Sequence, residues 1–186
     1  DETLSEIIAA GRAAAAANFK PVGSEFQVNT HTTYSQEQAS VTSLNDGGFV
    51  VTWHSYDQDG DEWGIYGQRY NASGTAVGAE FRINTTTAKE QDHPSVASLN
   101  DGGFVATWCS EDQDGDGFGI YGRRYDASGT AAGAEFKINT YTTGDQYLSS
   151  VTSLSDGGFV VTWISLDQDG DGNGIYGQRY DASGTA

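Results

Sequence analysis

The chain repeats itself every 55 residues, and this period limits the folds it can adopt more than any other feature. Tryptophans, phenylalanines and glutamines recur along it in a fixed register. The recurring residues are Trp53, Trp108 and Trp163; Phe26, Phe81 and Phe136; and Gln36, Gln91 and Gln146. A chain with such a repeat forms the same small structural unit several times, so its fold must be an array or a ring of such units.

Each unit carries four strand signals. In the middle unit SVASL (95–99) leads through an NDGG turn into FVATW (104–108), and IYGRRY (120–125) and AEFKIN (134–139) follow. Asn-Asp-Gly turns between alternating runs favour tight hairpins, because these residues tolerate positive φ. The β-branched and aromatic residues of the runs favour strand over helix. Four strands in about 50 residues is typical of one blade of a β-propeller.

The phase of the repeat predicts how the array closes. The chain enters at a fourth strand, EFQVN (25–29), and stops after a third strand, IYGQRY (175–180). If the first strand completes the last blade, twelve strands make three four-stranded blades with a permuted closure. We therefore expect an all-β domain over 18–186 with these repeat units: about 40–94, 95–149, and 150–186 completed by 18–39.

Two alternatives concern the overall arrangement. A β-trefoil or a β-prism also uses twelve strands with threefold repetition. Three propeller blades do not close a ring, since propellers have about four to eight blades. We therefore expect a homodimer that completes six blades, or a larger parent assembly to which this chain belongs.

Residues 1–17 lie outside the repeat. TLSE (3–6) has the spacing of a capping box, and the alanine-rich run that follows it has high helix propensity. A short N-terminal helix or linker is expected here. The chain does not begin with methionine, which suggests a processed product or a piece of a longer protein.

The charge of the chain excludes some partners. The formal net charge is -17, from 26 acidic against 9 basic residues. Nucleic acids and anionic membranes bind clustered Lys and Arg, so neither is expected as a partner. No apolar run approaches the roughly 18 residues of a membrane span, so membrane insertion is not expected. Cys109 is the one cysteine, which excludes an intrachain disulfide.

Between the second and third strand signals of every unit lies an acidic loop with aspartates at alternate positions. These aspartates are Asp57, Asp59 and Asp61; Asp112, Asp114 and Asp116; and Asp167, Asp169 and Asp171. Three carboxylates at this spacing in a tight turn can converge on one cation. Hard oxygen ligands favour Ca²⁺, which takes six to eight oxygens at about 2.3–2.6 Å. The loops therefore predict three calcium sites.

The acidic loops open like an EF-hand loop but do not continue as one. Gly117 and Gly172 stand at the sixth position, whereas the first loop has Glu62, which predicts a looser turn or an extra ligand there. The bidentate Glu of the twelfth EF-hand position is missing, and strands flank the loops. Backbone carbonyls of residues 63, 118 and 173, water or a distant acid must then complete the sites. The alternative is a solvated acidic turn, or the acidic surface of a halophile.

The segments DGGFVVTW and DQDGDGNGIYGQRYDASGTA resemble the tandem repeats of very large secreted bacterial proteins, described as calcium-binding or RTX-like exoproteins and adhesins. The resemblance covers 18–186. It implies a propeller-like fold, calcium dependence and an extracellular or cell-surface setting, with the periplasm as an alternative. The nonapeptide of RTX β-rolls, GGxGxDxxx, is absent, so a β-roll is not implied.

The sequence contains no catalytic motif. The histidines His31, His54 and His93 fall at different phases of the repeat, and the differences between repeats are scattered, so no enzyme is expected. Trp63 and Phe118 stand inside acidic loops, where they either fill the loop or contact a ligand such as a sugar ring. The sequence thus predicts a non-catalytic, calcium-stabilised module for binding or assembly. A calcium-dependent lectin or adhesin and a structural subunit of a larger complex are the alternatives.

Overall fold

The computed structural model describes residues 20–186, and within this range it contains strands and no helix. The predicted all-β class is confirmed. The strands are β1 (Gln36–Ser43), β2 (Phe49–Tyr56), β3 (Trp63–Tyr70), β4 (Ala76–Arg82), β5 (Gln91–Ser98), β6 (Phe104–Glu111), β7 (Phe118–Tyr125), β8 (Phe136–Lys137), β9 (Gln146–Ser153), β10 (Phe159–Leu166) and β11 (Asn173–Tyr180). The helix predicted over 1–17 lies outside the described residues. No helix in the described part is long and apolar enough to cross a membrane.

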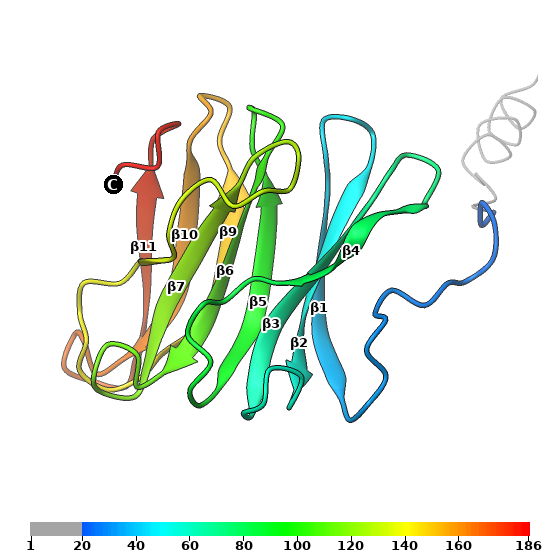
Figure 1. Cartoon of the computed structure of the whole chain (residues 1–186). Coiled ribbons are helices and arrows are strands. Elements are labelled where there is room, and N and C mark those ends of the chain that lie inside the picture. Colours follow the sequence, from blue (N-terminus) through cyan, green and yellow to red (C-terminus); the bar gives the residue numbers. More distant parts are fainter. Residues whose placement is uncertain (1–19) are drawn as a thin grey trace, which may run out of the picture.

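The strands form three antiparallel sheets, each made of strands that follow one another in the chain. The first sheet has the order β1-β2-β3-β4, the second β5-β6-β7-β8, and the third β9-β10-β11 (Figure 1). Leading strands of neighbouring sheets lie beside each other: the Val96 N–H donates to Ser40 Oγ at 3.3 Å, and the Val151 N–H donates to Ser95 Oγ at 3.2 Å. Sheets placed in this way resemble successive blades of a β-propeller.

The apolar core lies in layers between the sheets. Val50, Ile65 and Ile83 of the first repeat pack against Phe104 and Trp108 of the second sheet. The other face of the second sheet packs against the third, with Val105 and Ile120 meeting Phe159, Val161 and Trp163. The three tryptophans in register are 0–6% exposed, so they belong to the core. A β-trefoil or β-prism would instead gather its strands around a single central core.

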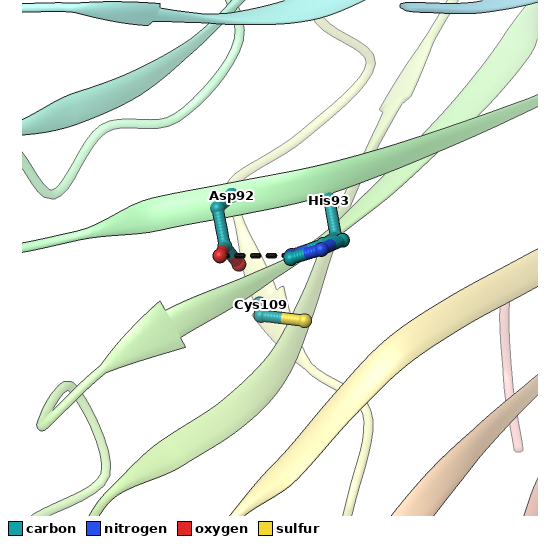
Figure 2. Close-up of side chains that lie close together, drawn as sticks. All are labelled: Asp92, His93 and Cys109. Carbon is teal, nitrogen blue, oxygen red and sulfur yellow. Dashed lines mark ion pairs between the residues drawn. The ribbon is translucent and has the colours of Figure 1, made fainter. Parts of the chain in front are cut away.

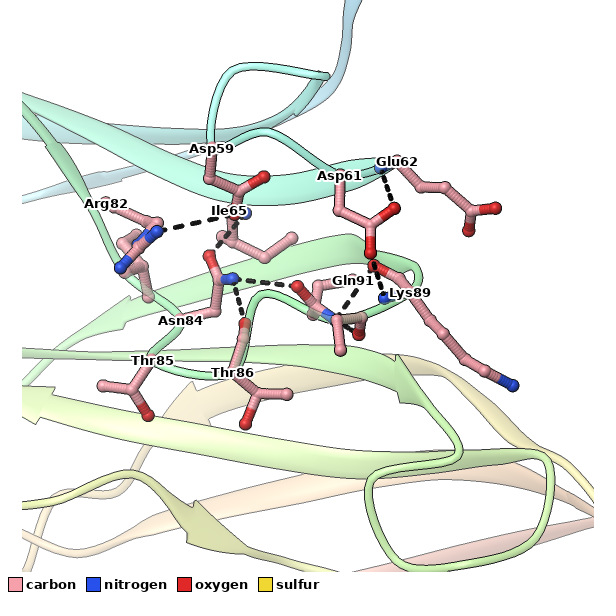
Figure 3. A network of polar contacts seen from close by, with 12 residues as sticks. Asp59, Asp61, Glu62, Ile65, Arg82, Asn84, Thr85, Thr86, Lys89 and Gln91 are labelled. Atoms are coloured by element: carbon pink, nitrogen blue, oxygen red, sulfur yellow. Dashed lines mark hydrogen bonds and ion pairs between the residues drawn. The ribbon is translucent and has the colours of Figure 1, made fainter.

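The glutamines in register have a structural role. Gln91 is fully buried, and its Oε1 accepts a hydrogen bond of 2.9 Å from Asn84 Nδ2. Asn84 Oδ1 in turn accepts from the Ile65 N–H at 2.8 Å (Figure 3). The third sheet repeats the contact, where Asn139 Nδ2 donates to Gln146 Oε1 at 2.8 Å. Each pair fastens the end of one repeat to the first strand of the next.

The structure corrects the predicted permuted closure. Segment 25–29 is not a strand and does not pair with β11; it lies against the first sheet. Its Phe26 ring is 5.4 Å from the Tyr70 ring, and the Tyr70 hydroxyl donates to the Val28 carbonyl at 2.9 Å. Figure 1 shows this segment at one end of the row of sheets and β11 at the other.

The fourth-strand segment of a repeat makes two separate contacts, and the predicted closure required both of them to be made within one sheet. Such a segment pairs with the third strand of its own sheet and also packs onto the following sheet, as Phe81 does on Tyr125 at 5.6 Å between ring centroids. Segment 25–29 keeps only the second contact. Its apolar side chains therefore fix it on the first sheet, far from the edge that it was expected to complete.

Candidate functional site

The three acidic loops join β2 to β3, β6 to β7 and β10 to β11, and they lie at the same end of the array (Figure 1). The first aspartate of each loop takes a positive φ of 54–58°. Its N–H donates to the carbonyl of the sixth loop residue at 2.6 Å in all three loops. The closing bond is thus the same where Glu62 replaces glycine. The inner turn bonds differ: the Gly115 and Gly170 N–H groups donate to the Asp112 and Asp167 carbonyls at 3.2 and 3.0 Å, and the first loop has no such bond, in line with the looser turn predicted from the sequence.

The middle aspartate of each loop folds back beneath the glycine that follows in the next strand. A Cβ built on Gly64 would lie 2.6 Å from Asp59 Oδ2, and one built on Gly119 would lie 2.7 Å from Asp114 Oδ2. The Asp59 side chain is only 2% exposed, and its nearest cation is Arg82, whose Nη1 lies 3.8 Å from Asp59 Oδ2. These glycines therefore leave room for a buried carboxylate.

The middle carboxylates of the first two loops are not fully hydrogen-bonded. Both oxygens of Asp59 are buried without a partner, and so is Oδ1 of Asp114. Asp114 Oδ2 accepts from Asn139 Nδ2 at 3.3 Å. An ionised group taken out of water without full compensation is costly. A cation is the chemical partner that would offset this cost.

In the first two loops the third aspartate contacts the segment that leads into the next sheet. Asp61 Oδ2 accepts the Lys89 N–H at 3.0 Å, as Figure 3 shows, and Asp116 Oδ2 accepts the Gly144 N–H at 3.1 Å. The aspartates of one loop therefore point to different neighbours. None of the nine belongs to a group in residues 20–186 whose ligand atoms all lie within 4.8 Å of one another.

A lysine adds to the charge balance of the second loop. Lys89 Nζ forms an ion pair with Asp112 and lies 3.7 Å from Glu111 Oε1. The hydrogen bond from Lys89 lowers the pKa of Asp112, and the same bond raises the pKa of Lys89. The first sheet has Tyr34 at the equivalent position and the third has Gly144, so this compensation exists only in the second repeat.

Several residues that differ between repeats gather where the first and second sheets meet, contrary to the scatter inferred from the sequence. Carboxylate oxygens of Glu62, Glu90 and Glu111 lie within 4.8 Å of one another. Burial raises the pKa of Glu90, and the neighbouring carboxylates, Asp92 first, raise it further. Their repeat equivalents do not form such a group. Departure from the repeat pattern was the signal that could have found this cluster.

Trp63, predicted as a ligand contact, belongs to an aromatic row at the same junction. Its ring stacks on His54 with centroids 4.1 Å apart and meets Tyr56 edge-on at 5.2 Å. Tyr34 lies 5.9 Å beyond Tyr56 and is 65% exposed. Burial lowers the pKa of His54 to about 4, and His93 contributes to the shift, so the imidazole is neutral at pH 7. The row runs from a buried imidazole to exposed rings.

Phe118, the other predicted ligand contact, faces a different junction. It packs against the core between the second and third sheets. Together with Asp92, His93, Asp145 and Tyr147 it lines a cavity of about 270 Å³. Its N–H donates to Asp145 Oδ1 at 3.1 Å. Trp63 and Phe118, equivalent in the repeat, thus do not share one surface.

A mixed cluster in the second sheet was missed by sequence reasoning. Asp92 on β5 lies directly opposite Cys109 on β6, and a bulge after Asp92 gives His93 a φ of 50°. His93 Nδ1 lies 2.8 Å from Asp92 Oδ2 (Figure 2). One ligand atom from each of the three residues lies within 4.8 Å of the others. Burial raises the pKa of both Asp92 and Cys109.

No protein-family model matches the chain, and no curated protein matches it. Solved structures do share its fold. An endo-arabinase from Bacteroides thetaiotaomicron has a TM-score of 0.57 and 15% identity, over 84% of this chain and 60% of that one. An α-L-arabinofuranosidase from Lactobacillus brevis has 0.54 and 15%, over 86% and 57%. A Hadza microbial sialidase has 0.52 and 14%, over 78% and 37%.

These similarities show the fold and not the activity, because the identities are low. The chain spans 60% of the length of the arabinase and 57% of that of the arabinofuranosidase. The common arrangement is the β-propeller-like succession of antiparallel sheets seen in Figure 1.

Proposed function

We propose that this chain is a non-catalytic, calcium-stabilised module for binding or assembly that works outside the cytoplasm. The observation that carries the proposal is the middle aspartate of the acidic loops. Asp59 has a buried side chain and receives no hydrogen bond, and its counterparts Asp114 and Asp169 lie against the equivalent glycines, half-buried in the second loop and exposed in the third. A solvated acidic turn would not bury an unpaired carboxylate as the first loop does, whereas a bound cation offsets the cost of burying it.

Calcium fits the ligands that the loops offer. Each loop supplies three aspartate carboxylates at alternate positions within five residues, so all of these side-chain ligand atoms are oxygens. Backbone carbonyls and water supply the remaining oxygens of a Ca²⁺ shell. The chain carries a net charge of -17, so three bound divalent cations relieve repulsion among the loops. Binding therefore stabilises the folded array.

Thermal unfolding with calcium and with EDTA tests the proposal. Calcium at about a hundred times its dissociation constant stabilises a site by about 2.7 kcal/mol, which raises the melting temperature. Asp59→Asn should reduce this shift, because it removes the buried charge of the first loop. Asp46→Asn is the matched control, since Asp46 is an exposed acid in the turn between β1 and β2. A melting temperature that responds to neither calcium nor EDTA would contradict the proposal.

Carbohydrate binding is a second candidate, and the aromatic row favours it. Exposed rings stack on sugars, and the carboxylate group of Glu62, Glu90 and Glu111, of which Glu62 precedes Trp63 in the chain, can accept hydrogen bonds from hydroxyl groups. The structural neighbours named as an arabinase and a sialidase have carbohydrate substrates by name, which makes a glycan the first ligand class to test.

Retention on immobilised polysaccharides tests this candidate. Trp63→Asn places in the first repeat the residue that the third repeat has as Asn173, so the strand should tolerate it. We expect Trp63→Asn to lose retention while its calcium-dependent melting shift stays unchanged. Phe118→Asn tests the other predicted contact in the same way. Equal retention of both variants and the parent chain would show that the two rings only pack within the protein and contact no glycan.

A further inference from the structure

Asp92, His93 and Cys109 bring three different metal-ligating groups together at one place. Two come from β5 and the third from the opposite position of β6 (Figure 2). Asp92 is 8% exposed and Cys109 is fully buried. Carboxylate, imidazole and thiol within 4.8 Å of one another form a ligand set that ordinary core packing does not need.

The cluster is not satisfied by the protein itself. Asp92 Oδ1 is buried and receives no hydrogen bond, while His93 Nδ1 lies 2.8 Å from the other carboxylate oxygen, Asp92 Oδ2. Within residues 20–186 the ion partner of Asp92 is His93, and no lysine or arginine reaches it. Buried polar groups in native proteins are normally paired, so this arrangement requires an explanation. A cation held between the three groups would satisfy them together.

We propose that Asp92, His93 and Cys109 form a binding site for a divalent metal ion of the Zn²⁺ class. Zinc accepts sulfur, nitrogen and oxygen ligands and is commonly held by three protein groups with a fourth position open. The thiol donates its sulfur as thiolate, and its proton passes to solvent when the metal binds. The cavity of about 270 Å³ lined by Asp92 and His93 gives access to the open position. Calcium, which prefers oxygen ligands, does not suit this set.

The other repeats show that the backbone conformation at His93 does not depend on the cluster. Gln38 and Leu148, the equivalents of His93, have φ of 55° and 54°, against 50° for His93. The left-handed bulge is therefore common to the fold. Only the second repeat places ligating groups at all three positions, since the third has Tyr147, Leu148 and Ile164 there.

The same comparison supplies variants that should fold. His93→Leu and Cys109→Ile each install the residue of the third repeat in a backbone that already accommodates it. Asp92→Asn keeps the shape of the side chain and removes its charge. His31→Leu is the control, because His31 lies outside the cluster.

Cobalt(II) titration of the full chain, after EDTA treatment and under reducing conditions, reports directly on sulfur ligation. We expect one Co²⁺ per chain, with a near-ultraviolet thiolate-to-cobalt charge-transfer band that one equivalent of Zn²⁺ displaces and millimolar Ca²⁺ does not. Cys109→Ile should abolish the band, and His93→Leu and Asp92→Asn should weaken binding at least tenfold. His31→Leu should behave as the parent chain.

Two results would overturn the site. One is the absence of any cobalt absorption at a large excess of metal in the folded parent chain. The other is a charge-transfer band that persists in Cys109→Ile. Far-ultraviolet circular dichroism of each variant confirms that it is folded, and Cys109→Ser is the second thiol variant in case Cys109→Ile is not. Because the readout is sulfur ligation, its result is independent of whether the acidic loops bind calcium.

Discussion

The turn that follows the third strand of each repeat is held by a single side-chain oxygen. Asp126 Oδ1 accepts the N–H groups of Ser128 at 2.8 Å and Thr130 at 3.0 Å. Asp181 does the same in the third repeat, and Asn71 does so in the first with the N–H of Ser73 at 3.0 Å. Aspartate and asparagine thus accept the same backbone hydrogen bonds in this turn, and only the aspartate side chain is titratable.

This difference predicts an effect of pH. The hydrogen bond from the Ser128 hydroxyl lowers the pKa of Asp126, and that from Ser183 lowers the pKa of Asp181. A lowered folded-state pKa gives stability that is present above the unfolded value of about 3.9 and is lost as pH falls through the folded value. We expect the melting temperature of Asp126→Asn/Asp181→Asn to fall less than that of the parent chain between about pH 5 and pH 2. Equal acid slopes for the two proteins would contradict this.

Among the elements, the strands and hairpins could be predicted from the sequence, because alternation and Asn-Asp-Gly turns act locally. The turn between β5 and β6 lies where SVASL (95–99) and FVATW (104–108) predicted it, but the strands are longer, Gln91–Ser98 and Phe104–Glu111. The fourth strand was the least secure element: β4 is regular, but β8 shrinks to Phe136–Lys137. Its residues are placed by packing on the next sheet more than by pairing within their own.

The candidate sites were harder to predict than the strands. Alternating aspartates indicated a cation site, but nothing in their spacing distinguishes Asp59, which is buried, from Asp61, which reaches the next sheet. The cluster of His93 and Cys109 depends on a bulge, which shifts side chains from one face of a strand to the other. Periodicity alone cannot predict such a shift.

The pairing of glycine with buried aspartate predicts the effect of adding one methyl group. Gly119→Ala would place its Cβ 2.7 Å from Asp114 Oδ2 and push the carboxylate out of the second loop. Overpacking of this kind costs about 1–3 kcal/mol, and the variant should also lose part of its calcium-dependent stabilisation. Gly177→Ala, on the β11 edge, is the control because its nearest neighbour is the Val161 carbonyl at 3.2 Å. Equal calcium-dependent shifts of the melting temperature in both variants would show that Gly119 does not affect calcium binding.

At the scale of the whole described array, the edge formed by β11 is exposed. Ile175 is 75% exposed, although the equivalent Ile65 and Ile120 are fully buried. In the first sheet Ile65 O accepts the Ile83 N–H at 2.7 Å from the segment that follows β4. Within the described residues β11 has no such neighbour. Exposed strand edges bind further strands readily.

We therefore expect two chains to close a ring of six blades, with segment 25–29 of each chain pairing with β11 of the other. Light scattering should give a mass of about 39 kDa, twice the 19.7 kDa of the chain. Ile175→Glu should shift the mass to that of the single chain, because the charge would be buried at the new contact. A monomer of the unchanged chain at micromolar concentration would refute the ring.

The central claim is that the acidic loops bind calcium, and a native mass spectrum with and without calcium tests it most directly. It counts ions and subunits in one measurement, so each loop can be related to a mass increment. We predict about three calcium ions per chain, one for each loop between the second and third strands of a repeat, removed by EDTA. The result that would contradict the account is a spectrum from calcium-saturated solution in which the chain carries no calcium.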